Sequence, residues 1–428
     1  MSDLPTPLPD SALDHNAAER DYRQARERLA ADDLEGAAQW LERAAANGHA
    51  AALTELAILH LHGFGREANP AHAVELLLRA ERNGGGTPET PYLLAQIALG
   101  GVALSRDPQR IDAWLADSAR RGHPAALRVA ALLFGQSEEA NHQQAAVTCL
   151  QRATAARDPV SAALLADRLH AGRGVARDAA QALDFANELR AMGIPVELPE
   201  PAGDVAPATT ASACEPPWES LSVLDARPRP SIERHCGAPE ITTCDDLLSD
   251  EECRYLIYSG SRFLERSKVF HPVTGQPLED EVRTSQHMSF IPTIDDVGIR
   301  VMQLRMSTLA GVELANCEEL ALLNYGIGDQ YRPHRDYFFP SAPELAQPGG
   351  QRHSTVCVYL NVVQEGGETV FPDRDVTVRP SRGRAVMFRN LHDDGSADPN
   401  SLHAGMPVLA GEKWLASCWI RVRALRQF

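Results

Sequence analysis

A helical motif that recurs along the first half of the chain constrains its fold more than any other feature. One copy, Ala37–His49, reads AAQWLERAAANGH, and its apolar residues have the spacing of one face of an α-helix. The copies end near residues 48, 84, 122, 158 and 193, so successive ends lie 36, 38, 36 and 35 residues apart. A period in this range is typical of paired helices that stack into a solenoid.

Partner helices are predicted between these copies. The segments 51–62 and 161–171 have helical spacing and are followed by Gly63 and Gly172, residues suited to a left-handed helix C-cap. The third repeat departs from the pattern, because Leu99-Gly100-Gly101 lacks a clean turn signature. Residues 20–193 resemble the tetratricopeptide superfamily, and more closely its Sel-one-like subclass. The resemblance implies a concave surface for a protein partner; a stabilising helical cap without a partner is the alternative.

The composition changes twice along the 428-residue chain. Residues 194–240 hold nine prolines, which exclude a long helix, and are predicted to form an extended Pro-rich linker. Its apolar residues Trp218, Leu221 and Leu224 are candidates to pack on the domain that follows. We therefore predict a disordered N-terminus over 1–19, a repeat solenoid over 20–193, this linker, and a second domain over 241–428.

The charge and cysteine content exclude several classes of protein. A net charge of -17 makes binding to nucleic acid or to an anionic membrane a poor expectation. No apolar run reaches the roughly 18 residues of a membrane helix. Residues 1–20 lack the basic and apolar regions of a signal peptide, so none is expected. Eight cysteines without a C-x-x-C pair favour a reducing compartment, and we predict a cytoplasmic protein.

From about Ile241, short β-rich segments replace the Ala-rich helices. Two helices lead this half: one begins at the capping box formed by Ser249 and Glu252, and the other covers 294–314. The predicted strands are 321–325, 355–363, 368–371, 384–388 and 414–422. The chain is thus expected to be a multidomain α+β protein, with an α-solenoid followed by a double-stranded β-helix, or jelly roll.

Two groups of residues in this half can carry chemistry. In an extended strand, residues i and i+2 share a face, so His334 and Asp336 can point into one cavity. An imidazole and a carboxylate are two thirds of a facial triad that leaves positions open on Fe(II). His403 supplies a third ligand. A hairpin through 407–411 is predicted to put Lys413 on the strand adjacent to that of His403, where its ammonium can bind the far carboxylate of a dicarboxylic co-substrate.

These residues, together with several flanking motifs, carry a second resemblance. The segment is similar to the prolyl 4-hydroxylase branch of the Fe(II)/2-oxoglutarate dioxygenases, and its motifs keep the family's order from Val282 to Trp414. The matching stretches are Val282-Arg283-Thr284-Ser285, Asn324-Tyr325-Gly326, Tyr331 through Tyr337, Gly349-Gly350-Gln351-Arg352, Gly366-Gly367-Glu368-Thr369-Val370-Phe371-Pro372, Ser401 through Gly405, and Lys413-Trp414.

The resemblance implies a set of roles. His334, Asp336 and His403 are expected to bind iron, and Lys413, Tyr325 and Thr369 to hold 2-oxoglutarate. The implied substrate residues, which line a groove for a peptidyl proline, are Tyr331, Arg352 and Trp419. The implied cofactors are Fe(II), 2-oxoglutarate and O2, with L-ascorbate. Arg421 replaces a histidine of some relatives, which leaves the substrate open. The loop Phe270–Leu278 resembles the family's mobile loop and is expected to cover the site when substrate binds.

Three functions are alternatives to a prolyl hydroxylase whose repeats recruit a protein substrate. One is a hydroxylase of a non-prolyl side chain or of a free amino acid. Another is a scaffold or sensor with an inactive oxygenase domain, which the intact ligand set disfavours. The third alternative is a zinc hydrolase, because His/Asp/His can bind zinc. However, no general base has a recognisable spacing in the sequence, and Lys413 would have no role in such an enzyme.

Overall fold

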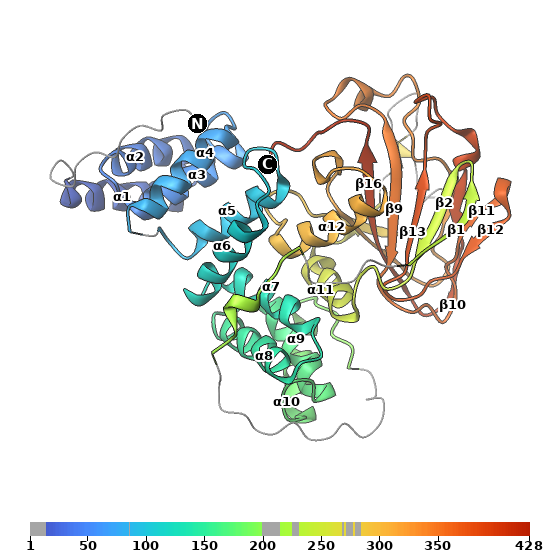
Figure 1. Ribbon diagram of the computed structural model, residues 1–428, viewed down its shortest axis with the longest axis horizontal. Helices are drawn as coiled ribbons and strands as arrows, with labels where there is room; N and C mark the ends of the chain where they lie inside the picture. The colour runs from blue at the N-terminus through green and yellow to red at the C-terminus, as the bar shows by residue number, and fades with distance from the viewer. Residues whose placement is uncertain are drawn as a thin grey trace. The chain divides into compact units, whose positions relative to one another are not determined.

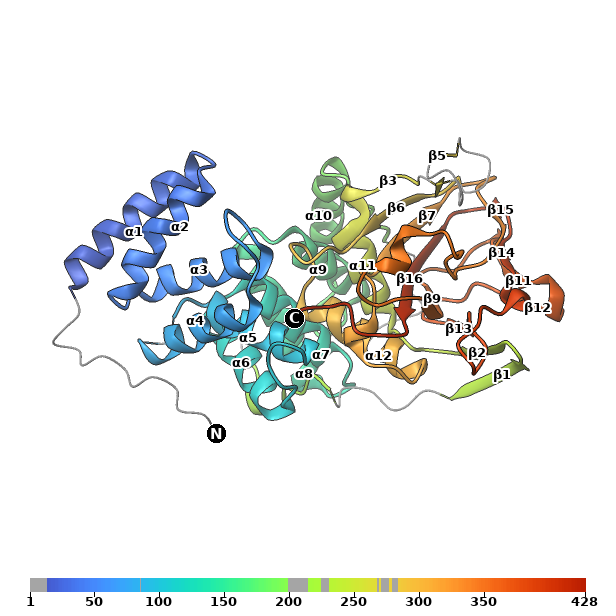
Figure 2. The same ribbon diagram turned by 90° about the horizontal axis from the view of Figure 1, so that it is seen from above.

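The computed structural model describes residues 14–84, 86–198, 215–224, 231–267, 269–270, 277–278 and 284–428 (Figures 1 and 2). Its contacts divide the chain into two compact units, one formed by residues 1–123 with 427–428, the other by 124–426. No helix in the described ranges is both long enough and apolar enough to cross a membrane. Because the contact boundary falls within the repeats, the domain limits drawn above stay a prediction.

The first unit is entirely helical where it is described. Its helices are α1 (His15–Ala30), α2 (Leu34–Ala46), α3 (Ala50–His62), α4 (Pro70–Arg82), α5 (Glu89–Gly100) and α6 (Pro108–Arg120). Neighbouring helices bury Leu41, Leu53 and Leu77, which are almost fully inaccessible, against one another. Phe428, from the end of the chain, also packs on this core. The alternation of motif helices α2, α4 and α6 with partner helices is the solenoid pattern that the repeats predict.

The repeats continue into the second unit as α7 (Pro124–Gly135), α8 (Ala140–Ala155), α9 (Pro159–Ala171) and α10 (Ala179–Ala191). Gly63 ends α3 and Gly172 ends α9, both in the left-handed conformation, which confirms the predicted C-caps. Gly101 ends α5 in the same conformation, with φ of 75°. The third repeat therefore has the same left-handed helix end as α3 and α9, although its sequence lacks a clean turn signature.

The rest of the second unit is a two-sheet β-domain with helices α11 (Asp250–Gly260) and α12 (Val297–Leu309). The strands are β1 (Ile232–Gly237), β2 (Glu240–Cys244), β3 (Glu265–Arg266), β4 (Val269–Phe270), β5 (Pro277–Leu278), β6 (Gln286–Ser289), β7 (Ala321–Tyr325), β8 (Tyr331–His334), β9 (Arg352–Tyr359), β10 (Glu365–Gly366), β11 (Thr369–Phe371), β12 (Val376–Val378), β13 (Ala385–Arg389), β14 (His403–Gly405), β15 (Val408–Ala410) and β16 (Lys413–Arg421).

An eight-stranded sheet, in the order β1-β2-β13-β9-β16-β7-β6-β3, faces a four-stranded sheet in the order β12-β11-β14-β8. The paired strands of both sheets run antiparallel in the described residues. Side chains of both sheets, among them Tyr359 of β9 and Phe371 of β11, form one buried cluster between the layers. The predicted α+β class, with a helical solenoid followed by a jelly-roll domain, is confirmed.

Helices α11 and α12 cover the other face of the large sheet, and α7 and α9 of the repeats pack against them (Figure 1). Buried polar groups cross this contact. Arg168 of α9, 2% exposed, binds Glu251 of α11 through two hydrogen bonds of 2.6 and 2.7 Å. Arg128 of α7 pairs with Asp296 at the start of α12 at 3.0 Å. The last repeats are therefore joined to the β-domain by paired buried charges.

The structure differs from two of the expectations about residues 194–240. Trp218 is buried, but it packs near Phe134 of α7, and Ser220 bonds to His142 of α8, so this segment docks on the repeats rather than on the β-domain. Strand β1 lies within the range predicted as linker, because its backbone pairs with β2 although its side chains are mostly exposed. Most of the loop expected to act as a lid, Phe270–Leu278, lies outside the described residues.

Candidate active site

Three potential metal ligands meet where β8 and β14 run side by side. His403 lies directly opposite His334 in the antiparallel register. Strand β8 ends at His334, so Asp336 is in the bend just beyond it and not within the strand that the i and i+2 argument assumed. One ligand atom from each of the three residues lies within 4.8 Å of the others. Among the described residues, this is the only group of three or more His, Cys, Asp or Glu side chains that are close enough together to hold a metal ion.

The backbone fixes the tautomer of both imidazoles. Nδ1 of His334 lies 2.8 Å from the carbonyl oxygen of Arg332, and Nδ1 of His403 lies 3.0 Å from that of Ser401. A carbonyl oxygen only accepts, so each Nδ1 carries a proton and Nε2 is the atom that each ring can offer to a metal. These Nε2 atoms lie 3.6 and 3.8 Å from the carboxylate of Asp336. Two imidazole nitrogens and a carboxylate thus converge, a ligand set suited to a divalent metal.

The carboxylate of Asp336 is held in its charged form. Burial alone would raise its pKa, but His403, His334, Arg352 and the hydroxyl of Thr355 lower the pKa below the ordinary value. Oγ1 of Thr355 donates to Oδ2 of Asp336 at 2.7 Å and accepts from Nδ2 of Asn390 at 3.1 Å. Both partners are buried. The oxygen that accepts from Thr355, Oδ2, is also the one nearest to Nε2 of His403, whereas Oδ1 is the oxygen nearest to Nε2 of His334.

Lys413 reaches the same cavity from the other sheet. The sequence predicted that it lies on a strand adjacent to that of His403, and this is wrong. After β14 the chain forms β15, which pairs with β10, and only then enters β16 in the large sheet. Lys413 and His403 therefore face one another across the two layers. Both are nevertheless in the lining of one cavity of about 50 Å³.

The ammonium of Lys413 is buried, and the acidic influence of Glu368 on its pKa is smaller than the effect of burial. The side chain is 2% exposed, and its Nζ lies 5.2 and 5.4 Å from the ring centroids of Tyr325 and Tyr359. No described carboxylate forms an ion pair with it. Burial lowers its pKa to about 8. A buried cation without a counter-ion is costly, so the cavity is built for an anion at this end.

The other two residues expected to hold 2-oxoglutarate lie beside Lys413. Tyr325 is directly opposite Lys413 in the register of β7 and β16. Thr369 comes from β11 in the small sheet, and its Oγ1 accepts a hydrogen bond of 2.6 Å from the hydroxyl of Tyr359. All of these side chains are buried. The structure therefore brings together the three residues named from the resemblance and adds Tyr359.

The predicted substrate residues are split by the structure. Tyr331 stacks on His334, with ring centroids 3.4 Å apart, and Tyr331 and Trp419 both line the cavity. Arg352 does not line it. Its guanidinium lies 4.4 Å from the ring of Trp419 and binds the carboxylate of Glu318 through bonds of 2.8 and 2.7 Å. Arg421 also binds Glu318 and is buried.

Strand alternation explains most of the lining residues that the sequence reading missed. On β16, Lys413, Leu415, Ser417 and Trp419 occupy alternate positions and all line the cavity. The same alternation on β9 turns Thr355, Cys357 and Tyr359 inward. Once Lys413 is assigned to the site, this period of two is a usable signal for Ser417. Asn390 follows the end of β13 and has no such signal.

Comparisons with known proteins agree on the C-terminal half. Residues 320–421 match the model of the 2OG-Fe(II) oxygenase superfamily. Probable prolyl 4-hydroxylase 6 of Arabidopsis thaliana is 39% identical over 197 residues, covering 42% of this chain and 67% of that protein. Prolyl 4-hydroxylase 1 of the same plant is 37% identical over 202 residues, covering 44% and 70%. The matches thus span about two thirds of the length of these relatives.

Two solved structures are similar to parts of the chain. One is the viral collagen prolyl hydroxylase of Paramecium Bursaria Chlorella virus-1, which is 28% identical, with 42% of this chain and 95% of that chain covered and a TM-score of 0.33. Another is a Sel1 repeat protein of Oxalobacter formigenes, which is 19% identical, with 44% and 78% covered and a TM-score of 0.36.

Proposed function

We propose that this chain, which belongs to the prolyl 4-hydroxylase family of the 2OG-Fe(II) oxygenase superfamily, hydroxylates a proline residue in a peptide or protein. Its C-terminal half is a 2-oxoglutarate-dependent dioxygenase domain. One observation carries the proposal: the ligand group of His334, Asp336 and His403 shares a cavity with the buried, unpaired ammonium of Lys413. A zinc hydrolase would have no use for that ammonium.

The residues present fit iron and 2-oxoglutarate. His334 and His403 offer Nε2 lone pairs and Asp336 offers a charged oxygen, a donor set suited to Fe(II) that leaves positions open. When bound, this metal supplies the oxidative chemistry that couples O2 and 2-oxoglutarate to hydroxylation. Lys413 would bind the distal carboxylate of 2-oxoglutarate as a charge-assisted pair, with the hydroxyls of Tyr325 and Thr369 beside it.

The substrate assignment rests on the aromatic residues near the ligand group. Tyr331 and Trp419 offer flat apolar surfaces to a pyrrolidine ring, and Arg352 holds Trp419 from behind. Arg421 pairs with Glu318 and lies outside the lining of the cavity, so the residue that differs from some relatives leaves this surface open. We assign Tyr331, Arg352 and Trp419 to substrate binding on these grounds.

The remaining parts of the proposal concern the cellular setting. The repeats would bind the protein substrate or a separate partner, and ascorbate would keep the metal reduced between turnovers. Cys149, Cys253 and Cys418 form no disulfide bond, in keeping with a cytoplasmic protein.

The test is formation of succinate from 2-oxoglutarate by the purified protein with Fe(II), ascorbate and a proline-rich peptide. We expect turnover that needs iron and rises with the peptide, and that is lost in His334→Ala. Turnover that depends on iron but does not rise with the peptide would support the oxygenase assignment and contradict the assignment of a prolyl substrate. Tight binding of 2-oxoglutarate without any turnover would favour a sensor.

A further inference from the structure

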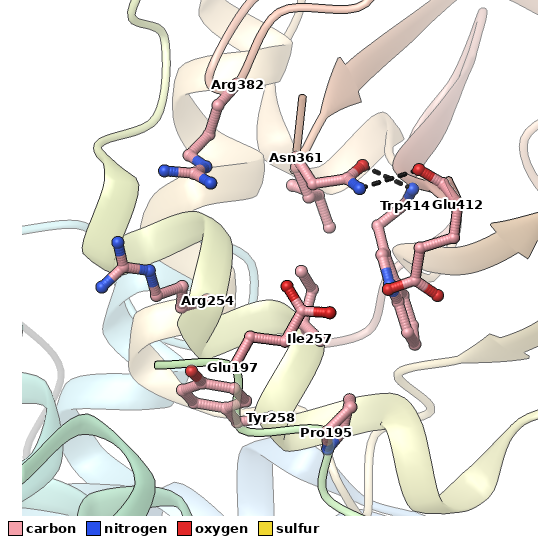
Figure 3. A pocket seen from close by; sticks show the side chains of 10 residues that line it. Pro195, Glu197, Arg254, Ile257, Tyr258, Asn361, Arg382, Glu412 and Trp414 are labelled. Carbon is pink, nitrogen blue, oxygen red and sulfur yellow. Dashed lines mark hydrogen bonds between the residues drawn. The ribbon is translucent and has the colours of Figure 1, made fainter. Parts of the chain in front are cut away.

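A single asparagine holds both ends of the turn that carries Lys413. The backbone N–H of Trp414 donates to Oδ1 of Asn361 at 2.8 Å, and Nδ2 of Asn361 donates to the carbonyl oxygen of Glu412 at 2.9 Å (Figure 3). These two peptide groups flank Lys413 directly. Asn361 lies two residues after the end of β9. Its side chain therefore connects the segment that follows β9 to the start of the neighbouring strand, β16.

A cavity lies on the outer side of this turn. Adjacent residues of a strand point to opposite faces, so Glu412 and Trp414 point away from the cavity that Lys413 lines. They line a second cavity of about 80 Å³, together with Ile257 of α11 and Asn361 (Figure 3). Beside this cavity the backbone is held by hydrogen bonds: those of Asn361, and one of 2.9 Å from the N–H of Leu360 to the carbonyl oxygen of Trp414.

The other bonds of this turn do not replace those of Asn361. The carboxylate of Glu412 accepts a hydrogen bond from Nδ2 of Asn324 at 3.0 Å, but this bond holds a flexible side chain and not the backbone. The ladder of β16 begins at Lys413 itself, opposite Tyr325. Asn361 therefore fixes the backbone on the side where the ladder has not yet begun.

We infer that Asn361 is a positioning residue for 2-oxoglutarate, because it fixes the backbone on both sides of the lysine whose ammonium receives the distal carboxylate. The inference rests on the proposed role of Lys413. A shift of the turn would move the ammonium out of reach without moving His334 and His403 on β8 and β14 or Asp336 in the bend after β8. Asn361 should thus control affinity for 2-oxoglutarate and not affinity for the metal.

The experiment measures two dissociation constants in the full-length protein by titration calorimetry without oxygen: that of Mn(II), and that of 2-oxoglutarate with Mn(II) present. In Asn361→Ala we expect the constant for 2-oxoglutarate to rise about tenfold or more, with that for Mn(II) within about twofold of wild type. Glu412→Gln is the matched control, because it alters the second cavity but keeps the backbone groups that Asn361 binds; it should bind 2-oxoglutarate like wild type.

Asn361→Asp keeps the size of the side chain and the acceptor for Trp414, but replaces the donor to Glu412 with a carboxylate oxygen that repels the carbonyl oxygen of Glu412. This variant should also bind 2-oxoglutarate more weakly than the wild type. It replaces the alanine variant in the experiment if the alanine variant does not fold. Unchanged affinity for 2-oxoglutarate in both variants would overturn the inference, as would an equal loss of Mn(II) and 2-oxoglutarate, the sign of a general structural defect. Failure of the wild-type protein to bind 2-oxoglutarate would overturn the proposed function, and the inference with it.

Discussion

His334 and His403 lie opposite one another on β8 and β14, with ring centroids 4.2 Å apart and each Nδ1 next to a backbone carbonyl. The ladder of the small sheet thus sets the spacing of two metal ligands before any metal arrives. We expect His403→Ala to lose tight binding of one equivalent of Mn(II), measured by calorimetry. His353→Ala is the control, since His353 lies outside the ligand group. Equal binding by both variants would reject the assigned ligands.

The hydroxyl of Thr355 orients the carboxylate ligand through its 2.7 Å bond to Asp336. Thr355→Val keeps the shape of the side chain and removes this donor. Loss of such an outer partner typically lowers metal affinity about 10- to 100-fold, and we expect a loss in this range for Mn(II). Ser354→Ala, at the neighbouring position that points to the other face of β9, should keep wild-type affinity. Unchanged affinity in Thr355→Val would mean that the relay does not tune the ligand.

The pKa of Lys413, lowered to about 8 by burial, predicts how 2-oxoglutarate binding depends on pH. Below pH 8 the ammonium is charged and the dissociation constant should be flat. Above pH 8 the lysine must take up a proton to bind the carboxylate, so the constant should rise about tenfold per pH unit. Lys413→Arg keeps its charge throughout, and its constant should not change between pH 7 and 9. A wild-type constant that stays flat to pH 9 would contradict the assignment.

The ion pair between Arg168 of α9 and Glu251 of α11 joins the last repeats to the β-domain, so we expect these repeats to stabilise that domain. The side chains are 2% and 12% exposed, so Arg168→Met leaves a buried carboxylate without its partner. We expect a loss of about 3–5 kcal/mol in the free energy of unfolding by urea. Arg382→Met breaks the exposed pair with Asp250 and should cost about 1 kcal/mol or less. Similar small losses in both variants would show that the repeats contribute little there.

The sequence predicted those parts of the molecule that local patterns determine. The helical period and the glycine caps at Gly63 and Gly172 gave the solenoid, and the motifs around His334, Asp336, His403 and Lys413 gave the site. It could not predict how the strands pair. Adjacent strands for His403 and Lys413 were a reasonable guess from a ten-residue separation, but β15 intervenes and pairs elsewhere.

Contacts between distant segments were the other gap. The hydrogen bond from Thr355 to Asp336 and the bonds of Asn361 to the turn of Lys413 join segments that are 19 or more residues apart. Trp218 was a candidate to pack on the following domain because it is apolar, and it lies against Phe134 of α7. In each case the partner depends on tertiary packing, which has no local sequence pattern.

The most direct test of the account is the mass of a proline-containing peptide after incubation with the protein, Fe(II), 2-oxoglutarate and ¹⁸O₂. We predict a gain of one heavy oxygen atom, located at proline by fragmentation, with one succinate formed per oxygen inserted. The gain should be absent with His334→Ala or without 2-oxoglutarate. Succinate formed without any oxygen inserted into proline, in peptides that stimulate turnover, would contradict the account.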